Sequence, residues 1–558
     1  MRPLALVLGL GLTVGAQPTV RFDRETMRLR SASVAAVGAA WRLTLSMEND
    51  NGVQDGVLPT SYRRWWHCEI GNLRATGETL DVTVERAGYS DVILPVWALS
   101  TDGVTFSPYT RVPTTALPTV QGGTRHLFTL QTPAGVRAIR LAKYFPHTVA
   151  DKDAFLAGIA GHRHVRSTAA IGTSRLGRPI HMVELTDAGV ADAGKTRVWI
   201  HAAVHPSETT AYFVAEGLVA FLLSGDPWAE LLLDHAIVDI VPMANPDGCA
   251  RGNYRTNADS VNLEDEWAQP YASTVPEIVA LRTQIERFMG TPATPGANPI
   301  RVLLNLHASH DVAYPFHFQH VANPSFDLVT NRTGVLPVVN QLEGQWIAAF
   351  RARSAFTARG TTQSSTMGAP ARPFVESMMH DRWTIDSRWA GNGQAPVMAI
   401  TYEGTYRLGP DGMAWNTPED YRANGAELGR ALADTLGLEP GATVSRYGSD
   451  CNGPTLAVTA LGGSGVTLRF DYIHTDLSAL LLLVLGSDVQ ALPLPASPCL
   501  LRTSPAATLF LQRNVFGSGR LDLPMPLVPG FAVQAQALSW SAAASFGSTA
   551  GASIRANF

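Results

Sequence analysis

A histidine and a glutamate separated by two residues, in His205-Pro206-Ser207-Glu208, are followed about a hundred residues later by a second histidine, His307. Zinc in hydrolytic sites is held by three nitrogen or oxygen side chains, and the fourth position is left for water. A strand that ends at His205 and turns directly into a helix can bring His205 and Glu208 to one metal ion. The third ligand must then come from a neighbouring strand that is distant in sequence. We therefore expect His205, Glu208 and His307 to bind one Zn2+ ion.

Two apolar segments downstream are suited to carry the rest of such a site. Residues 301–307 (Arg-Val-Leu-Leu-Asn-Leu-His) predict a buried strand with His307 at its exit. Residues 395–403 predict another strand, which ends at Glu403. A carboxylate beside a zinc-activated water can take its proton and pass it to a leaving amine. Glu403 is the expected general base.

The residues between the two histidines carry further motifs. An apolar strand at 236–242 is followed by Asn245-Pro-Asp-Gly248, then by Gly252-Asn-Tyr-Arg255 and by Val261-Asn-Leu-Glu-Asp-Glu-Trp267. With HPSE upstream, this order resembles the zinc carboxypeptidase (funnelin) family, most closely its cytosolic-carboxypeptidase-like branch, over roughly residues 165–436. The resemblance implies the same three metal ligands, Glu403 as the base, and Arg255 as the arginine that polarises the substrate carbonyl.

One departure from the family concerns the substrate's end. Where the family has an adjacent asparagine and arginine that grip a terminal carboxylate, this chain has Glu264 and Asp265. Two anions would repel a carboxylate that an arginine fork would bind. Three interpretations stay open: the pocket accepts an amine-bearing or uncharged end, another arginine such as Arg382 or Arg388 substitutes, or exopeptidase activity is lost.

Length and composition indicate a globular protein with more than one domain. A chain of 558 residues is too long for one hydrophobic core. Its 46% hydrophobic and 16% charged residues, with a formal net charge of −4, are typical of a globular protein and offer no basic surface for nucleic acid. Arg2 precedes an apolar run, Leu4 to Val14, and small residues follow, so residues 1–16 are expected to be a signal peptide, with a buried strand as the alternative. The run is too short to span a membrane.

The pattern beyond residue 16 predicts three modules. Residues 17–147 alternate apolar and polar side chains, as in 41–46, 79–85 and 138–142, which predicts an all-β domain. The order of Trp65-Trp66, then residues 99–103, then Tyr144-Phe-Pro146 resembles the β-sandwich that precedes the catalytic domain in the cytosolic branch. Residues 148–440 alternate strands and helices, which predicts an α/β domain whose mixed sheet is covered by helices. Residues 446–558 contain strands such as 466–472 and 532–538 and are expected to form a small C-terminal β-sandwich.

Two helices of the central domain have clear boundaries. Thr274 and Glu277 are expected to form a capping box around Pro276, with Gly290 closing that helix. Thr417-Pro418 is expected to open the last helix of the domain, which would end at Gly437.

Four cysteines agree with an exported chain. Cys451 and Cys499 both lie in the C-terminal module, and we expect them to form a disulfide. Cys68 and Cys249 lie in different predicted domains and are either bridged or buried as free thiols.

These patterns together predict an exported zinc metallo-carboxypeptidase-like hydrolase that cleaves a peptide or amide bond near a peptide's end. Its partner would be a peptide or protein substrate, with Glu264, Asp265 and Arg382 as candidate substrate-binding residues. The alternatives are a zinc amidase or deacylase acting on non-protein amides such as wall peptides, and an inactive metal-loaded binding scaffold. Oligomeric state is left open.

Overall fold

The computed structural model describes residues 17–310, 312–319, 335–356, 363–364, 374–439, 442–461, 466–474, 476–495, 497–514, 517–525, 532–541 and 546–556. The expected signal peptide, residues 1–16, lies outside the described residues. The described chain divides into two compact units, Met1–Thr148 with Gly248–Ser260, and Val149–Asp247 with Val261–Phe558. The segment Gly248–Ser260 thus interrupts the predicted α/β domain and groups with the N-terminal residues.

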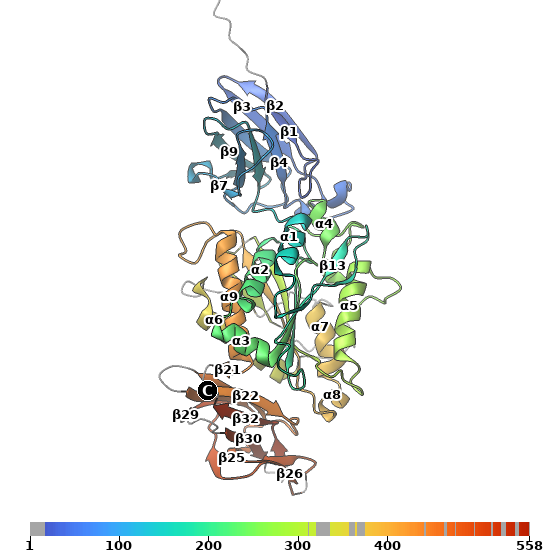
Figure 1. Cartoon of the computed structure of the whole chain (residues 1–558), viewed down its shortest axis with the longest axis vertical. Helices are drawn as coiled ribbons and strands as arrows, with labels where there is room; N and C mark the ends of the chain where they lie inside the picture. Colours follow the sequence, from blue (N-terminus) through green and yellow to red (C-terminus); the bar gives the residue numbers. More distant parts are fainter. Residues whose placement is uncertain are drawn as a thin grey trace, which may run out of the picture. The chain divides into compact units, whose positions relative to one another are not determined.

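The first unit is built from two five-stranded sheets (Figure 1). The predicted strands are present, and their alternation places one set of side chains inside, as in β9. The first sheet has the order β1 (Thr19–Arg21), β4 (His67–Gly71), β10 (Ala138–Ala142), β6 (Val96–Ser100), β7 (Thr110–Arg111). The second has the order β2 (Ser31–Val37), β3 (Ala40–Ser46), β5 (Thr79–Glu85), β9 (Arg125–Gln131), β8 (Thr119–Gln121).

An eight-stranded mixed sheet forms the centre of the second unit, as the sequence predicts. Its four inner strands, which run parallel to one another, are buried along almost their whole length. The order is β11 (Val165–Ser167), β14 (Val183–Leu185), β16 (Ala236–Val241), β15 (Thr196–Ala202), β17 (Ile300–Ser309), β20 (Met398–Thr405), β18 (Phe316–Phe318), β19 (Gln363–Ser364). A separate hairpin pairs β12 (Ala170–Thr173) with β13 (Pro179–His181).

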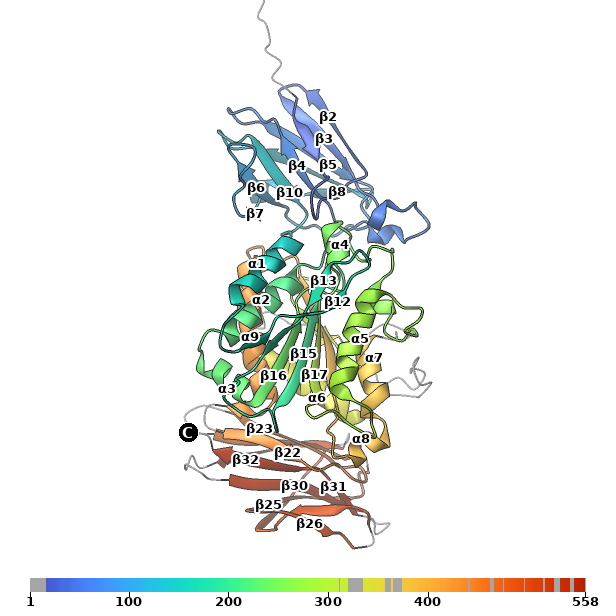
Figure 2. The same ribbon diagram turned by 45° about the vertical axis from the view of Figure 1, so that its right-hand side comes forward.

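Helices cover both faces of this sheet (Figure 2). One face carries α2 (Thr210–Leu222) and α9 (Pro418–Thr435), with α1 (Val149–Ile159), α3 (Pro227–His235) and α6 (Pro337–Arg353) on the same side or next to them. The other face carries α5 (Pro276–Met289) and α7 (Val375–Met379), followed by a π-helical turn (His380–Thr384) and α8 (Ser387–Gly391). The short helix α4 spans Pro246–Ala250.

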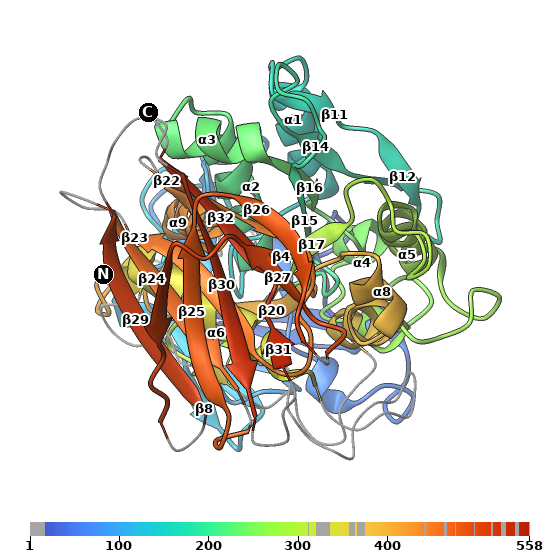
Figure 3. The same cartoon turned by 90° about the horizontal axis from the view of Figure 1, so that it is seen from below.

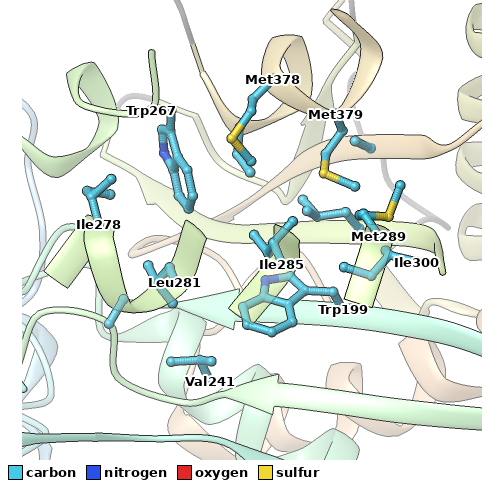
Figure 4. Close-up of a cluster of buried hydrophobic side chains, with 14 of the residues drawn as sticks. Trp199, Val241, Trp267, Ile278, Leu281, Ile285, Met289, Ile300, Met378 and Met379 are labelled. Atoms are coloured by element: carbon cyan, nitrogen blue, oxygen red, sulfur yellow. The ribbon is translucent and has the colours of Figure 1, made fainter. Parts of the chain in front are cut away.

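A dense apolar core lies between the sheet and α5. Trp199, Trp267 and Met379 are buried against apolar side chains of α5 such as Leu281 and Ile285 (Figure 4). This core fixes the face of the sheet from which the site residues emerge.

The two predicted helix starts have different outcomes. Helix α9 begins with a complete capping box between Thr417 and Asp420, and Gly437 follows its end with φ 67°. The capping box predicted for α5 is wrong, because Val275 is the residue before the helix and no side chain caps it. The Thr274 hydroxyl donates instead to Glu266, and Glu277 accepts from the backbone N–H of Arg175. Each side chain has a tertiary partner that replaces the local one.

The C-terminal residues form antiparallel sheets (Figure 3). The expected disulfide between Cys451 and Cys499 is confirmed. The larger sheet contains β21 (Leu438–Glu439), β22 (Ala442–Tyr447), β32 (Gly551–Ala556), β30 (Ala532–Trp540), β25 (Leu480–Gly486) and β28 (Ala507–Phe510), with β31 (Phe546–Ser548) beside β30. The smaller sheets pair β23 (Thr455–Leu461), β24 (Val466–Ile473) and β29 (Ser518–Met525), and β26 (Val489–Pro493) with β27 (Leu500–Thr503).

The other two cysteines, Cys68 and Cys249, are buried free thiols. Within the described residues, no helix combines the length and the apolar character that crossing a membrane requires.

Candidate metal centre

A sharp turn between a strand and a helix places the first two predicted ligands. Strand β15 ends at Ala202, and Ala203 adopts a left-handed backbone conformation with φ 59°. His205 follows at once, and Glu208 comes just before helix α2 begins at Thr210. Helix α2 is buried along nearly all of its residues, so the turn is anchored at both ends. The predicted strand–turn–helix is therefore confirmed.

Neighbouring strands bring the third ligand and the expected base to the same level of the sheet. In the parallel pair of β17 and β20, His307 lies directly opposite Glu403. Residues two apart on a strand point to the same face, so Asn305 shares the face of His307. Strand register, which cannot be obtained from sequence spacing, decides that His307 and Glu403 are neighbours.

The three predicted ligands converge on one position. His205 Nδ1 lies 2.9 Å from Glu208 Oε1, and His307 Nδ1 lies 2.8 Å from Glu208 Oε2. The two Nδ1 atoms are 3.1 Å apart, and all ligand atoms lie within 4.8 Å of one another. All three residues are at most 4% exposed. The structure brings together the triad that the sequence predicts.

This donor set fits a zinc ion. Two imidazole nitrogens and a carboxylate are the ligand types of catalytic zinc sites. The local field also favours positive charge: burial lowers the pKa of His307, but Glu208 and Glu264 outweigh it and raise that pKa well above its ordinary value. Burial raises the pKa of Glu208, but His205 and His307 outweigh it and hold it well below its ordinary value. A metal cation between these groups would supply the positive charge that a proton on His307 otherwise supplies.

The outward nitrogens of both histidines also face acceptors. His205 Nε2 lies 3.0 Å from Asn262 Oδ1. The amide of Asn262 is oriented by Asp265, whose carboxylate accepts from Asn262 Nδ2 at 2.7 Å. His307 Nε2 lies 3.5 Å from Glu264 Oε2. Such contacts leave the Nδ1 lone pairs available for a metal.

Glu264 therefore lies beside a metal ligand, and it is 3% exposed. Burial raises its pKa, but the hydrogen bond with His307 and the charges of the histidines bring it down to about 2. Asp265 is exposed. That Glu264 and Asp265 contact substrate stays a prediction, and for Glu264 the described contacts are with His307 and Asn305 instead.

The arginine candidates for the substrate's end have partners of their own. Arg382 lies in the turn His380–Thr384, and its guanidinium pairs with Glu286 on α5. Arg388 pairs with Asp386 at 2.8 Å and is largely exposed. No contact of either arginine with the metal triad is found among the described residues, and a substrate contact of Arg382 stays a prediction.

Arg255 lies in the segment Gly248–Ser260, which belongs to the N-terminal unit. The buried carboxylate of Asp50 accepts backbone N–H groups of Tyr254, Arg255 and Thr256 at 2.6, 2.8 and 2.7 Å. Its neighbour Asn51 donates to the carbonyl of Asn257 at 2.8 Å. The loop that carries Arg255 is thus held by residues from the N-terminal module, and the role of Arg255 at the metal stays a prediction.

The motif Asn245-Pro-Asp-Gly248 has a structural explanation. Asn245 Nδ2 donates to the carbonyl of Val204, next to His205, at 3.2 Å. Asp247 is fully buried and accepts from Leu176 N and Arg178 Nη1, both at 2.7 Å. Asn245 therefore holds the turn that carries the first ligand, and Asp247 holds the loop at residues 176–178.

Sequence reasoning missed Asn262, Asn305, His201 and Asp50. Asn262 lies within a quoted motif, and Asn305 is a polar residue in an apolar strand, two residues before His307. A buried polar residue on the ligand's face of a strand was a usable signal. Nothing in the sequence marks Asp50.

Comparison with known proteins agrees with this geometry. Residues 154–413 match the Peptidase_M14 family, zinc carboxypeptidase. The chain therefore carries a Peptidase M14 zinc carboxypeptidase domain, and the cofactor of the His205–Glu208–His307 site is one zinc ion.

Relatives with known sequences match shorter stretches. An uncharacterized protein of Zymomonas mobilis is 32% identical over 152 residues, which cover 26% of this chain and 40% of that protein. Mouse cytosolic carboxypeptidase 6 is 28% identical over 153 residues, 27% of this chain and 28% of that protein. The matched part thus spans less than half of these relatives.

Solved structures match over a longer range. A metallo-carboxypeptidase from Burkholderia cenocepacia superposes with a TM-score of 0.57 at 23% identity, over 75% of this chain and 99% of that one. A metallo-carboxypeptidase from Pseudomonas aeruginosa, solved with (2-guanidinoethylmercapto)succinic acid, gives a TM-score of 0.57 at 20% identity, over 74% and 98%. At these identities the similarity shows a common fold.

Proposed function

We propose that this chain is an exported zinc metallo-carboxypeptidase-like hydrolase that cleaves a peptide or amide bond near a peptide's end. The observation that carries the proposal is the convergence of His205, Glu208 and His307, with Glu403 directly opposite His307 on the next strand. A buried set of ligands with a carboxylate beside it is the arrangement that zinc-assisted hydrolysis needs.

The residues of the chain take separate roles in this reaction. Zinc held by His205, Glu208 and His307 would lower the pKa of a bound water and polarise the substrate carbonyl. Glu403 takes a proton from the attacking water and passes it to the leaving amine. Arg255 stabilises the negative charge that develops on the carbonyl oxygen, an effect worth about 3–4 kcal/mol for one well-placed donor. His205, Glu208 and His307 keep the metal in place.

A second candidate is an amidase or deacylase that acts on non-protein amides such as wall peptides. The observation that favours it is the pair Glu264 and Asp265, because it offers no cation where the family grips a terminal carboxylate. Such an enzyme keeps the zinc chemistry and needs no free carboxylate on its substrate.

A panel of peptides with acidic, neutral, basic and amidated ends, assayed with zinc-loaded protein, tests the proposal. We expect turnover of at least one class, with basic or amidated ends faster than glutamate ends. Glu403→Gln should reduce kcat by at least about 100-fold while zinc stays bound, since the base is lost and the ligands are not. Faster turnover of glutamate ends would contradict the specificity argument. A zinc-loaded protein that hydrolyses neither the peptides nor simple amides would support a binding scaffold instead.

We also propose that the chain is exported and that both flanking modules are β-sandwiches. The Cys451–Cys499 disulfide supports export, because such bonds persist in oxidising compartments. The paired sheets of each module support the sandwich assignment.

A further inference from the structure

The buried carboxylate of Glu264 belongs to a line of polar side chains that ends at a zinc ligand. Trp199 Nε1 donates to His201 Nδ1 at 3.0 Å, and Asn305 Nδ2 donates to Glu264 Oε1 at 2.9 Å. Glu264 Oε2 faces His307 Nε2 at 3.5 Å. All five residues are at most 4% exposed, so water is largely kept from them.

One link remains, between His201 and Asn305. The two residues lie directly opposite each other in the register of β15 and β17. His201 Nε2 and Asn305 Oδ1 are both buried, and neither atom makes a hydrogen bond within the described residues. Because a ring N–H can donate and an amide oxygen can accept, each of these atoms is the kind of partner that the other lacks.

With His201 and Asn305 paired, the first member of the line sets the direction of every later contact. An indole nitrogen can only donate, so His201 Nδ1 must accept and His201 Nε2 must donate. Asn305 then receives this proton at Oδ1 and presents its NH2 group to Glu264. A carboxylate can only accept, so its other oxygen, 3.5 Å from His307 Nε2, favours a proton on that nitrogen. With its proton on Nε2, His307 keeps a lone pair on Nδ1, and this lone pair points to the metal position.

We propose that Glu264 is a positioning residue of the metal centre, which holds His307 in its metal-binding tautomer at the end of a directed line from Trp199. A carboxylate at this place replaces the family's asparagine, an amide that can donate as well as accept. The acidic residue that sequence reasoning assigned to the substrate pocket thus acts on the zinc ligand instead. The inference rests on the metal site of the proposed function and not on its substrate.

Glu264→Gln tests the direction of the line. If the new amide accepts from Asn305, its NH2 group faces His307 Nε2 and favours the tautomer with its proton on Nδ1. If the amide flips, two NH2 groups oppose each other at Asn305. Either way the zinc affinity of the metal-free protein, measured by competition with a fluorescent chelator, should fall by about 10- to 100-fold.

The double variant Glu264→Gln/Asn305→Asp tests the same line in reverse. The introduced aspartate can accept both from His201 and from the NH2 group of the introduced glutamine, so the glutamine oxygen again faces His307 Nε2–H. The net charge equals that of the unmodified protein, and most of the zinc affinity should return. Recovery of affinity is not expected from a residue that only fills space.

Glu266→Gln is the matched control. It removes one negative charge two residues away, where the carboxylate accepts from the Thr274 hydroxyl, and zinc affinity should change less than about twofold. Unfolding midpoints of the metal-free variants check that each one folds.

The outcomes separate the inference from the proposed function. Failure of the unmodified protein to bind zinc would overturn the metal site itself. Unchanged zinc affinity in Glu264→Gln, with only KM altered, would overturn the positioning role and return Glu264 to the substrate pocket. A folded double variant as weak as Glu264→Gln would overturn the directed line.

Discussion

At the scale of single residues, the metal centre depends on both nitrogens of each histidine. His205 and His307 turn Nδ1 toward Glu208, while their Nε2 atoms face Asn262 and Glu264. Polar groups in this position decide which nitrogen carries the proton, and so they decide whether the ligand is ready for the metal. Substituting a residue that touches no metal can therefore weaken metal binding.

Another buried histidine, His317 on β18, should make the fold sensitive to acid. Burial among the rings of Trp346, Phe350 and Tyr402 lowers its pKa to about 3. Because the folded pKa lies below the ordinary value, the unfolded chain binds the proton first as pH falls. The stabilising contribution is complete above pH ~6.5 and is lost toward pH ~3, at about 1.4 kcal/mol per pH unit.

His317→Phe should remove this dependence. Between pH 6.5 and 5 the unmodified protein should lose about 2 kcal/mol more stability than the variant. Urea unfolding at both pH values, with a chelator present so that zinc loss does not contribute, measures the difference. Parallel pH responses of the two proteins would show that His317 does not titrate on unfolding.

At the scale of elements, α2 and α9 approach each other through glycines. A Cβ atom at Gly425 of α9 would lie 2.2 Å from the carbonyl oxygen of Val214, and one at Gly217 of α2 would lie 2.0 Å from that of Arg422. Backbone cannot yield as a side chain can, so no larger residue fits without moving a helix. Because α2 begins two residues after Glu208, this packing also holds the ligand turn.

Gly425→Ala should therefore destabilise the fold by about 1–3 kcal/mol through overpacking. Gly344→Ala in α6 is the matched control, because its Cβ would meet nothing within 4 Å. That change should stabilise the helix by about 0.5–1 kcal/mol, since alanine loses less backbone entropy than glycine. Chemical unfolding followed by tryptophan fluorescence distinguishes the two, and equal effects of the two substitutions would refute the close approach of the helices.

At the scale of the whole molecule, the division into units does not follow chain order. The loop that carries Arg255 groups with the N-terminal module, and Asp50 holds it through three backbone N–H groups. The N-terminal module therefore orders the loop of Arg255, the residue that is expected to polarise the substrate carbonyl.

Asp50→Asn should release this loop. The new NH2 group would oppose backbone donors, at a cost of about 1–3 kcal/mol. We expect kcat/KM to fall by about 10- to 100-fold, since small displacements of a catalytic group have large effects, while zinc affinity stays unchanged. Asp55→Asn is the control, because Asp55 is half exposed and pairs with Arg63 and Arg86 at the surface, where such pairs contribute little. Unaltered kinetics in Asp50→Asn would argue against the loop's role.

The sequence by itself determined the chemistry and most of the elements. Local sequence pattern and residue chemistry were enough to predict four features. These are the ligand types, the strand–turn–helix at His205, the strand that ends at His307 and the Cys451–Cys499 pair. The capping box predicted at Thr274 was wrong because its two side chains bind residues outside the helix start. Thr274 donates to Glu266, and Glu277 accepts from the backbone N–H of Arg175.

Only the tertiary structure decided which residues meet. The register of β15, β17 and β20 placed His201 beside Asn305 and His307 beside Glu403. The same folding gave Glu264 a histidine for a partner and gave Asp50 the loop of Arg255. Contacts between distant strands depend on how whole elements pack and on which buried polar groups need hydrogen-bond partners. Neither can be predicted from the spacing of residues along the chain.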